Sequence, residues 1–318
     1  MSLRTLLRAA LVPVAAAAAF AAMPVANADP VTPYIVGGGN ATETYSFMGS
    51  IQLNGRHGCG ASLVSAQWMV TAGHCTYNQQ SPIQPSQMRV RVGSTQWSSG
   101  GTLAGVSQIV RHPNYRPGGS QQYDIALLRL STSVSQAPIS LGDSSPAANT
   151  AVRLIGWGQT CNTPQCGQPP TNLKQLDTRI NPDSMCTNEF NGSHELCVYS
   201  TTSQTACYGD SGGPMVQKVG AEWRLLGATS RAGVVNQTCG SGQATIYTDV
   251  VAFTQWIQST TGGGTPNPPG CSTSEWNPAQ YYPPGSTVAY RGYQWRNPYW
   301  SYGEAPGQSY AWQRVGEC

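Results

Sequence analysis

Charge is scarce in this chain of 318 residues, in which Asp, Glu, Lys and Arg together account for 10% of the sequence. The 17 basic and 14 acidic residues leave a net charge of +3, and no run of Lys or Arg concentrates the positive charge. We therefore expect no nucleic-acid partner. Beyond residue 28 no apolar run is long enough to cross a bilayer, so we expect no membrane association.

Metal-binding cysteine pairs are also missing. None of the ten cysteines stands in a Cys-x2-Cys spacing, so neither a zinc site nor an iron–sulfur cluster is predicted. No cofactor or other metal site is predicted, and no clear acidic loop decides whether calcium binds. An even number of cysteines instead favours disulfides, which persist outside the cytoplasm.

The N-terminus predicts export. Arg4 and Arg8 precede an apolar, Ala-rich stretch, and Ala26-Asn27-Ala28 matches a cleavage signal. The alternative is a membrane anchor, which is disfavoured because prolines interrupt the stretch. We predict a signal peptide over residues 1–28 and a secreted, extracellular protein.

Glycine and proline are abundant, with 36 and 23 residues, and they separate short β-type runs. Five such runs lie between residues 35 and 261: Arg89–Val92, Ile125–Leu130, Val152–Ile155, Trp223–Gly227 and Ala244–Val250. Short runs with turn residues between them predict an all-β sandwich or barrel. One helix is predicted over Val251–Ser259, because its apolar residues fall largely on one face.

The composition changes abruptly at residue 262. Residues 262–270 contain only Gly, Thr, Pro and Asn and are predicted to form a linker. The aromatic-rich residues 271–318 are predicted to form a small separate module. Because so small a unit builds little core, its only two cysteines, Cys271 and Cys318, are predicted to pair.

Three separated segments contain the side chains that acyl transfer needs: Thr71–Cys75 (TAGHC), Asp124–Leu128 (DIALL) and Gly209–Pro214 (GDSGGP). Alone, each has an ordinary explanation: a structural histidine, a strand start and a tight turn. Together they supply a serine hydroxyl, an imidazole base to take its proton and a carboxylate to orient that base. Glycines beside the serine allow backbone N–H groups to converge on an oxyanion.

Two further motifs occur along the chain, Ile35–Gly38 (IVGG) and Gly156–Gly158 (GWG), which brings the number of motifs to five. With them, residues 35–261 strongly resemble the chymotrypsin/trypsin family of serine proteases. The resemblance implies two six-stranded antiparallel β-barrels with a C-terminal helix and an active site between the barrels. It also implies hydrolysis of a protein or peptide substrate through an acyl-enzyme intermediate.

The resemblance assigns roles to individual residues. Ser211 matches the nucleophile, His74 the general acid/base and Asp124 the carboxylate that orients His74. The N–H groups of Gly209 and Ser211 would form the oxyanion hole. Ser230 would contact the buried carboxylate and pair with the substrate backbone.

The family also implies activation by proteolysis. A cut between Tyr34 and Ile35 would remove residues 29–34 as a short propeptide. The new α-ammonium of Ile35 would then form a buried ion pair with Asp210. Because Tyr precedes the cut, a trypsin-like activator is not indicated.

The family pattern pairs most of the cysteines. With the local and terminal pairs that remain, the predicted disulfides are Cys59–Cys75, Cys186–Cys197, Cys207–Cys239, Cys161–Cys166 and Cys271–Cys318. Every cysteine then has a partner, and each bridge restricts the unfolded chain.

The resemblance places Thr205 at the floor of the primary specificity pocket and Ala232 and Thr245 at its walls. A trypsin carries Asp at the floor, so cleavage after Arg or Lys is not expected. We predict small or medium apolar residues at P1, the residue before the cut, because the Thr245 side chain would shorten the pocket. Against this, Tyr34 suits a chymotrypsin-like pocket, and the family usually has an aromatic residue where Arg231 stands.

The tail resembles the small chitin-binding modules of bacterial chitinases, carbohydrate-binding families five and twelve. The matching features include Trp276, Tyr290–Trp295 and Gly303–Gly307. Three tryptophans are expected in its core: Trp276, Trp295 and Trp312. Tyr299 and Trp300 are expected to form an exposed platform for sugar rings.

The leading hypothesis is a monomeric, secreted serine endopeptidase held on chitin or a related insoluble polysaccharide by its tail. The alternative is a catalytically inactive chitin-adhesive protein, although the intact His, Asp and Ser motifs argue against it. A glycoside hydrolase is a third hypothesis, but no persuasive pair of carboxylates is present. The excess of Arg over Lys and the Ala-rich leader indicate a bacterial, actinomycete-like source.

Overall fold

The computed structural model describes most of the chain. The described residues are 35–161, 170–235, 238–239, 244–262, 273–274, 276–277, 280–290, 293–307 and 311–317. The predicted signal peptide and propeptide lie outside these ranges, as does all but the first residue of the predicted linker. No helix within these ranges is both long enough and apolar enough to cross a bilayer.

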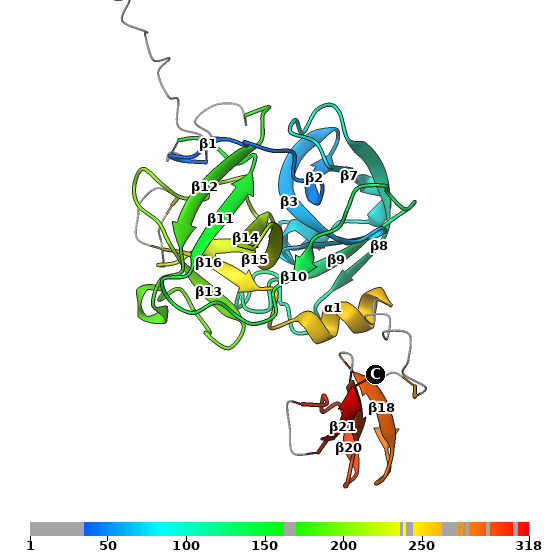
Figure 1. Cartoon of the computed structure of the whole chain (residues 1–318). Helices are drawn as coiled ribbons and strands as arrows, with labels where there is room; N and C mark the ends of the chain where they lie inside the picture. The colour runs from blue at the N-terminus through cyan, green and yellow to red at the C-terminus, as the bar shows by residue number, and fades with distance from the viewer. Residues whose placement is uncertain are drawn as a thin grey trace, which may run out of the picture. The chain divides into compact units, whose positions relative to one another are not determined.

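Six antiparallel strands from the first half of the chain close into a barrel in the order β2-β3-β4-β9-β8-β7 (Figure 1). They are β2 (Met48–Leu53), β3 (Arg56–Ser65), β4 (Trp68–Thr71), β7 (Met88–Val92), β8 (Thr102–Arg111) and β9 (Ala126–Leu130). In β7 the buried residues Met88, Val90 and Val92 alternate with arginines, as expected for a strand with one apolar face. Asn54 and Gly55, both with positive φ, make the tight turn from β2 to β3.

The second half of the chain forms a larger sheet. Its main path runs β1-β12-β11-β14-β15-β16-β13 in antiparallel pairs, and β10 pairs with β15 in parallel. The strands are β1 (Gly39–Asn40), β10 (Ser140–Leu141), β11 (Ala151–Gly156), β12 (Lys174–Arg179), β13 (Glu195–Tyr199), β14 (Pro214–Val219), β15 (Glu222–Ala232) and β16 (Ala244–Asp249).

The predicted second six-stranded barrel is not confirmed as a closed barrel. Among the described residues, β12 and β13 are joined through an isolated bridge between Ile180 and Val198, not through a continuous strand ladder. The Asn181 N–H after this bridge still donates to the Cys197 carbonyl at 2.7 Å, but the next residue, Pro182, has no N–H group to donate. Each of the five predicted strands is nevertheless observed, with slightly different bounds.

The C-terminal helix α1 spans Thr254–Thr261, and the predicted start at Val251 was too early because residues 251–253 form the preceding turn. Gly262, with a φ of 66°, ends the helix in the left-handed conformation that glycine adopts readily. The remaining short elements are η1 (His74–Thr76), β5 (Tyr77–Asn78), β6 (Ser81–Pro82), η2 (Pro85–Gln87) and η3 (Asp183–Met185).

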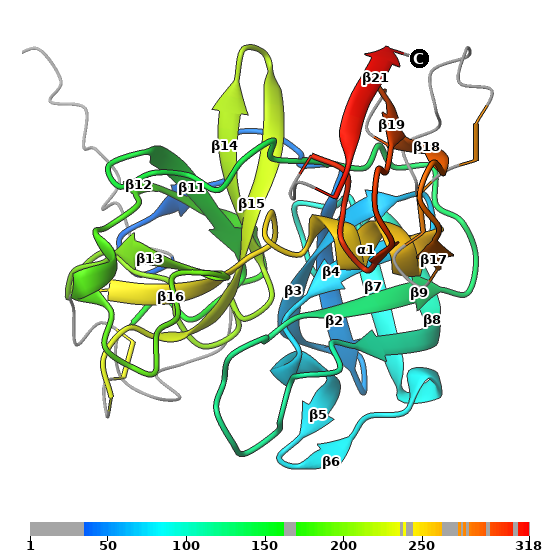
Figure 2. The same cartoon turned by 90° about the horizontal axis from the view of Figure 1, so that it is seen from below.

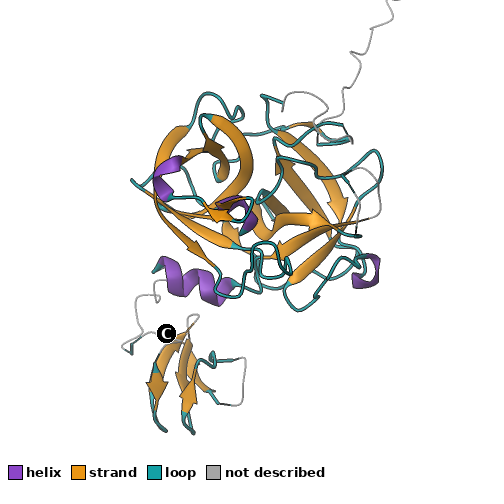
Figure 3. Cartoon of the chain, turned by 180° about the vertical axis from the view of Figure 1, so that it is seen from behind, coloured by secondary structure: helices purple, strands orange, loops and turns teal. Residues whose placement is uncertain are grey.

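One hydrophobic cluster joins the barrel to the larger sheet. It contains Met48 and Leu127 from the barrel together with Trp157, Val216 and Ile257 from the second half. Figures 2 and 3 show the barrel and the sheet side by side. Because protein interiors are close-packed, a shared core holds the residues at the boundary between them at fixed separations.

The tail forms a small β unit of its own. Its strands are β17 (Tyr281–Tyr282) paired with β20 (Ser301–Tyr302), and β18 (Thr287–Tyr290) and β21 (Gln313–Glu317) on either side of β19 (Tyr293–Arg296). Trp276 and Trp312 are buried in its core, and Trp295 packs against that core partly buried. The predicted core role is therefore confirmed for Trp276 and Trp312 and in part for Trp295.

Candidate active site

His74 and Asp124 meet at one end of the barrel. His74 begins η1 shortly after β4 ends, and Asp124 stands two residues before β9 begins. In the antiparallel pair of β4 and β9, Thr71 lies opposite Ala126. The end of one strand therefore adjoins the start of the other, and a sequence separation of 50 residues becomes a direct contact.

The Asp124 carboxylate is fully buried and accepts three hydrogen bonds. The His74 backbone N–H donates to Oδ1 at 2.8 Å, while His74 Nδ1 and Ser230 Oγ each donate to Oδ2 at 2.7 Å. A buried carboxylate requires such partners. Because Nδ1 donates its proton to Asp124, the neutral His74 ring leaves Nε2 free to accept a proton.

Burial and charge act on these two pKa values in opposite directions. Burial alone lowers the pKa of His74, but the Asp124 charge and the hydrogen bond to it outweigh burial and raise that pKa. Burial alone raises the pKa of Asp124, but His74 and the Ser230 hydroxyl outweigh it and lower that pKa. The arrangement therefore favours an ionised carboxylate beside a basic imidazole.

Ser211 lies in a tight loop before β14 that is pressed against the barrel. The Gly60 N–H in β3 donates to the Ser211 carbonyl at 2.7 Å. Gly212 has a φ of 71°, and a Cβ at this position would lie 2.1 Å from Thr71 Oγ1. Both facts require glycine. Because Thr71 ends β4, the contact places the serine loop close to the segment that carries His74.

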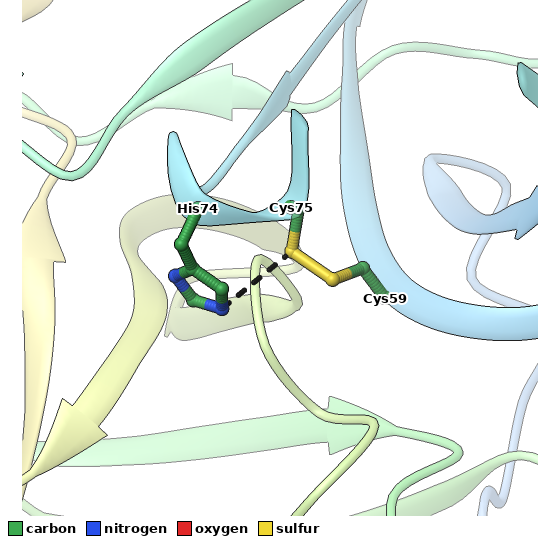
Figure 4. Close-up of side chains that lie close together, drawn as sticks. All are labelled: Cys59, His74 and Cys75. Carbon is green, nitrogen blue, oxygen red and sulfur yellow. Dashed lines mark hydrogen bonds between the residues drawn. A yellow bond between two sulfur atoms is a disulfide. The ribbon is translucent and has the colours of Figure 1, made fainter. Parts of the chain in front are cut away.

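Ser211 and His74, both described residues, do not share a hydrogen bond. The His74 Nε2 atom lies 3.8 Å from Cys75 Sγ (Figure 4). Cys75 is disulfide-bonded to Cys59, whose neighbour Gly60 contacts Ser211. His74 Nε2 is thus left with one weak sulfur contact near the serine loop. In unliganded enzymes this bond is often long and tightens when substrate binds.

Cys59, His74 and Cys75 bring three potential metal ligands within 4.8 Å of one another. Both sulfur atoms, however, are joined in a disulfide and neither is a thiolate. The cluster therefore offers a metal ion one imidazole nitrogen, which is too few ligands for a stable site.

The backbone N–H groups of Gly209 and Ser211 have no acceptor among the described residues. Gly209 has a φ of 97°, which favours glycine. Its carbonyl accepts a hydrogen bond from His57 Nε2 at 2.9 Å, and His57 Nδ1 accepts one from Ser50 Oγ at 2.8 Å. Burial lowers the pKa of His57 to about 4, so the ring is neutral near pH 7. His57, which no sequence motif marks, thus fixes the orientation of the Gly209 peptide.

Asp210 is a second buried carboxylate, and no Lys, Arg or His in the described ranges forms an ion pair with it. Its oxygens accept from the Gly158 N–H at 2.7 Å and the Cys207 N–H at 2.9 Å. A Cβ on Gly156 or Gly158 would lie within about 2 Å of this carboxylate, which explains both glycines of the GWG motif. Burial raises the pKa of Asp210 to about 7 despite the two hydrogen bonds.

Ile35 is buried in the apolar core of the larger sheet. Its neighbour Val36 forms an antiparallel bridge with Thr205, in which the Thr205 N–H donates to the Val36 carbonyl at 2.9 Å. Gly37 has a φ of 80°, and a Cβ there would lie 1.8 Å from the Ser203 carbonyl oxygen. The IVGG motif therefore packs against the segment that leads to the serine loop.

A cavity of about 260 Å³ opens beside Ser211. Its lining includes all three predicted pocket residues, Thr205, Ala232 and Thr245. The other lining residues are Ser200, Ala206, Cys207, Tyr208, Ser211, Thr229, Ser230, Arg231, Thr238, Cys239 and Ala244. Thr205 Oγ1 donates to the Ala206 carbonyl at 3.0 Å and lies 3.2 Å from Thr245 Oγ1, which lies 2.9 Å from Ser200 Oγ. None of the described lining residues is a carboxylate.

Three predicted disulfides are confirmed: Cys59–Cys75, Cys186–Cys197 and Cys207–Cys239. Cys161 is also disulfide-bonded, but its predicted partner Cys166 lies outside the described residues. The predicted pair Cys271–Cys318 lies outside them as well.

Among the described residues of the tail, four aromatic side chains are exposed. Tyr299 and Trp300 are 60% and 69% exposed, as expected, and Tyr281 and Tyr302 are exposed as well. The pairing of β17 with β20 sets Tyr281 opposite Tyr302, and their rings stack 4.2 Å apart. Sequence reasoning missed this second pair because it arises from strand register. Exposed aromatic side chains of this kind are typical of binding surfaces.

Comparison with known proteins agrees with the geometry. The sequence model of the family described as Trypsin matches residues 35–257. Trypsin alpha of Drosophila melanogaster is 34% identical over 239 residues, which is 70% of this chain and 86% of that protein. Trypsin alpha-4 of Lucilia cuprina is 33% identical and hypodermin-B of Hypoderma lineatum 35% identical, with the same coverage of both chains. This chain belongs to the trypsin family of serine proteases.

Membership in the trypsin family makes the chain a serine endopeptidase, whose substrates are proteins or peptides. The expected fold is confirmed as a mainly β trypsin fold with one closed six-stranded barrel and a short C-terminal helix. The family match ends at residue 257, so chitin binding by the tail stays a prediction. A bacterial source also stays a prediction, because these relatives come from insects.

Proposed function

We propose that His74, Asp124 and Ser211 are the catalytic residues of a secreted, monomeric endopeptidase. The observation that carries the proposal is the buried Asp124 carboxylate, which holds His74 through Nδ1 and leaves Nε2 near the serine loop. The proposed protease domain spans residues 35–261, after a signal peptide over 1–28 and a propeptide over 29–34.

In the first step Ser211 Oγ attacks the scissile carbonyl while its proton passes to His74 Nε2. The imidazolium that forms is stabilised by Asp124, and the carbonyl oxygen, now negative, accepts hydrogen bonds from the Gly209 and Ser211 N–H groups. Each such donor is worth about 3–4 kcal/mol in comparable sites. His74 then gives its proton to the leaving amine, and water repeats the sequence on the acyl-enzyme.

Replacement of the nucleophile tests this assignment. Ser211→Ala in the activated full-length chain should abolish turnover of a denatured protein substrate and labelling by a covalent serine-directed probe. His74→Ala should abolish turnover as well. Full turnover by folded Ser211→Ala would overturn the assignment, because the nucleophile would then have to be another residue.

We also propose that cleavage between Tyr34 and Ile35 activates the chain. The raised pKa of Asp210 and the lack of a cation beside it in the described residues favour an incoming ammonium as its partner. Buried ion pairs form only with good geometry, so pairing with Ile35 would lock the serine loop. Acetylation of the new N-terminus after cleavage should abolish activity. Unchanged activity would contradict the pairing.

For substrate preference we propose small or medium apolar residues at P1. In the cavity the hydroxyls of Ser200, Thr205 and Thr245 hydrogen-bond one another, and no described lining residue supplies a negative charge for Arg or Lys. The relatives are named trypsins, and cleavage after Arg or Lys is therefore the competing outcome. Mass spectrometry of cut sites in a denatured protein decides between them.

Finally, we propose that the module over residues 271–318, joined by the linker 262–270, holds the enzyme on chitin. Tyr299 and Trp300 offer flat, exposed rings that can stack on sugar faces, and Tyr281 with Tyr302 extends the surface. Trp300→Ala and Tyr281→Ala should each weaken retention on insoluble chitin several-fold. Val315→Ala, which also removes exposed apolar surface from the tail, is the matched control.

A further inference from the structure

A buried ion pair lies next to the serine that supports Asp124. Arg231 follows Ser230 in β15, and its Nη1 and Nη2 atoms donate to Glu195 Oε1 at 2.7 Å and Oε2 at 3.0 Å. The Glu195 side chain is 1% exposed and that of Arg231 10%. A two-point contact of this kind fixes the plane of the guanidinium group, which a lysine could not reproduce.

Main-chain carbonyls accept further hydrogen bonds from Arg231, and the second N–H of Nη1 is shared between one of them, Gln121, and the closer Ser230 Oγ. Nε and Nη2 donate to Asn188 at 3.2 and 3.0 Å, Nη2 also donates to Glu189 at 3.2 Å, and Nη1 reaches Gln121 at 3.5 Å. These bonds offset the desolvation of the pair. They also join Arg231 to the segment that leads to Asp124.

The remaining contact of Arg231 is with Ser230. Nη1 lies 3.3 Å from Ser230 Oγ. A guanidinium group can only donate, so Ser230 Oγ accepts at this contact. The single hydroxyl proton of Ser230 is then directed to Asp124 Oδ2, 2.7 Å away.

We propose that Arg231, anchored on Glu195, is a positioning residue of the catalytic centre that turns the Ser230 hydroxyl toward Asp124. The proposal rests on the catalytic roles proposed above for His74 and Asp124. Without Arg231 the Ser230 hydroxyl can rotate, and the Asp124 carboxylate loses its hydrogen bond from Ser230, so that only His74 still donates to it.

The charges around this network set the direction of the expected effect. Asp124 faces His74 directly and Arg231 through Ser230, while Arg231 faces Glu195 and the neighbouring His194. Loss of the Ser230 hydrogen bond makes the carboxylate more basic and favours the charged form of His74. The acidic limb of the kcat–pH profile should therefore move to higher pH.

The test is the double variant Arg231→Met/Glu195→Met in the activated full-length protein. Replacing a buried ion pair by apolar residues of similar volume is often neutral for stability, so the variant is expected to fold. We expect kcat to fall about tenfold, as for loss of a hydrogen bond to a charged group, with little change in KM. Arg231→Lys should recover only part of the loss.

Ser230→Ala distinguishes a positioning role of Arg231 from a purely structural one. In that background the Arg231→Met/Glu195→Met change should have little further effect on kcat or on the pH profile, because the hydroxyl it positions is gone. The matched control is the ion pair Arg153–Asp177, whose carboxylate is 68% exposed and whose replacement by Met and Asn should leave kcat unchanged.

Wild-type kcat and an unshifted pH profile in the folded double variant would overturn the proposal, as would full additivity with Ser230→Ala. Either result leaves the proposed function intact if Ser211→Ala is inactive. An active Ser211→Ala would instead refute the proposed function itself.

Discussion

The two halves of the protease domain accommodate buried charge differently. Across residues 48–130, all of which the structure describes, Asp124 is the one buried side chain with a formal charge, and it lies at the end of the barrel. The larger sheet buries Lys174, Glu195, Asp210 and Asp249. The barrel thus positions His74 and Asp124 on an otherwise uncharged core. The larger sheet instead has buried charged side chains near its serine loop and cavity. We therefore expect the stability of the sheet, more than that of the barrel, to depend on pH and on the surroundings of its buried charges.

Asp124→Asn removes the one buried charge of the barrel and should have the largest effect. The Asn side chain can hold His74 in the wrong tautomer, and kcat should fall about 10⁴-fold, the drop found for this change in the serine protease on which the family mechanism was established. Steady-state kinetics near pH 7 measure it. A loss below tenfold in a folded variant would show that the barrel carboxylate is not what orients His74.

Asp210 tests the charge dependence of the sheet. Its pKa rises from 3.8 to about 7 on folding, so between these pH values the folded, uncut chain binds more protons than the unfolded chain. Its contribution to the free energy of unfolding should therefore fall, by up to about 4 kcal/mol, as pH rises from 4 to 7. Urea unfolding of uncut Ser211→Ala with and without Asp210→Asn isolates this term. Parallel pH profiles of the two proteins would contradict the comparison.

A third test adds a methyl group to each half. Gly158→Ala places a Cβ 2.1 Å from Asp210 Oδ2, and we expect a loss of more than about 2 kcal/mol in the free energy of unfolding, together with loss of activity. Gly58→Ala in barrel strand β3 meets nothing within 4 Å and should leave both quantities nearly unchanged. Equal effects of the two changes would remove the distinction between the halves.

His57 connects the halves, and its replacement should have the smallest effect. His57→Phe keeps the ring packed near Trp157 but removes the hydrogen bond to the Gly209 carbonyl. We expect kcat to fall about fivefold, since a typical hydrogen bond contributes about 1 kcal/mol, with KM little changed. An unchanged kcat would mean that the backbone of Gly209 holds its orientation without help from the barrel.

Local motifs can be recognised in the sequence because each motif satisfies a local physical requirement. Gly212 of GDSGGP stands where a Cβ would strike Thr71, and both glycines of GWG stand where one would strike the Asp210 carboxylate. The motif and the geometry therefore have one cause. The strands and α1 followed from their apolar patterns.

Features that depend on pairing across long separations were not predictable in this way. Arg231 and Glu195 are 36 residues apart and belong to no motif, and the stack of Tyr281 on Tyr302 depends on the register of β17 with β20. The isolated bridge of Ile180 with Val198, which stands where a closed second barrel was expected, also depends on which segments meet. None of these can be obtained from periodicity, because each is fixed by which partner the folded chain brings into contact.

The Cys59–Cys75 disulfide has a consequence for where the enzyme can work. The bridge fastens the residue next to His74 to strand β3, beside the Gly60 contact with Ser211. A reducing compartment would release that tether while leaving the amino-acid sequence unaltered. In a reducing compartment the protein would therefore hold the His74 ring less firmly and would be less active. Reduction of this disulfide would thus limit damage to the proteins of the cell that makes the enzyme.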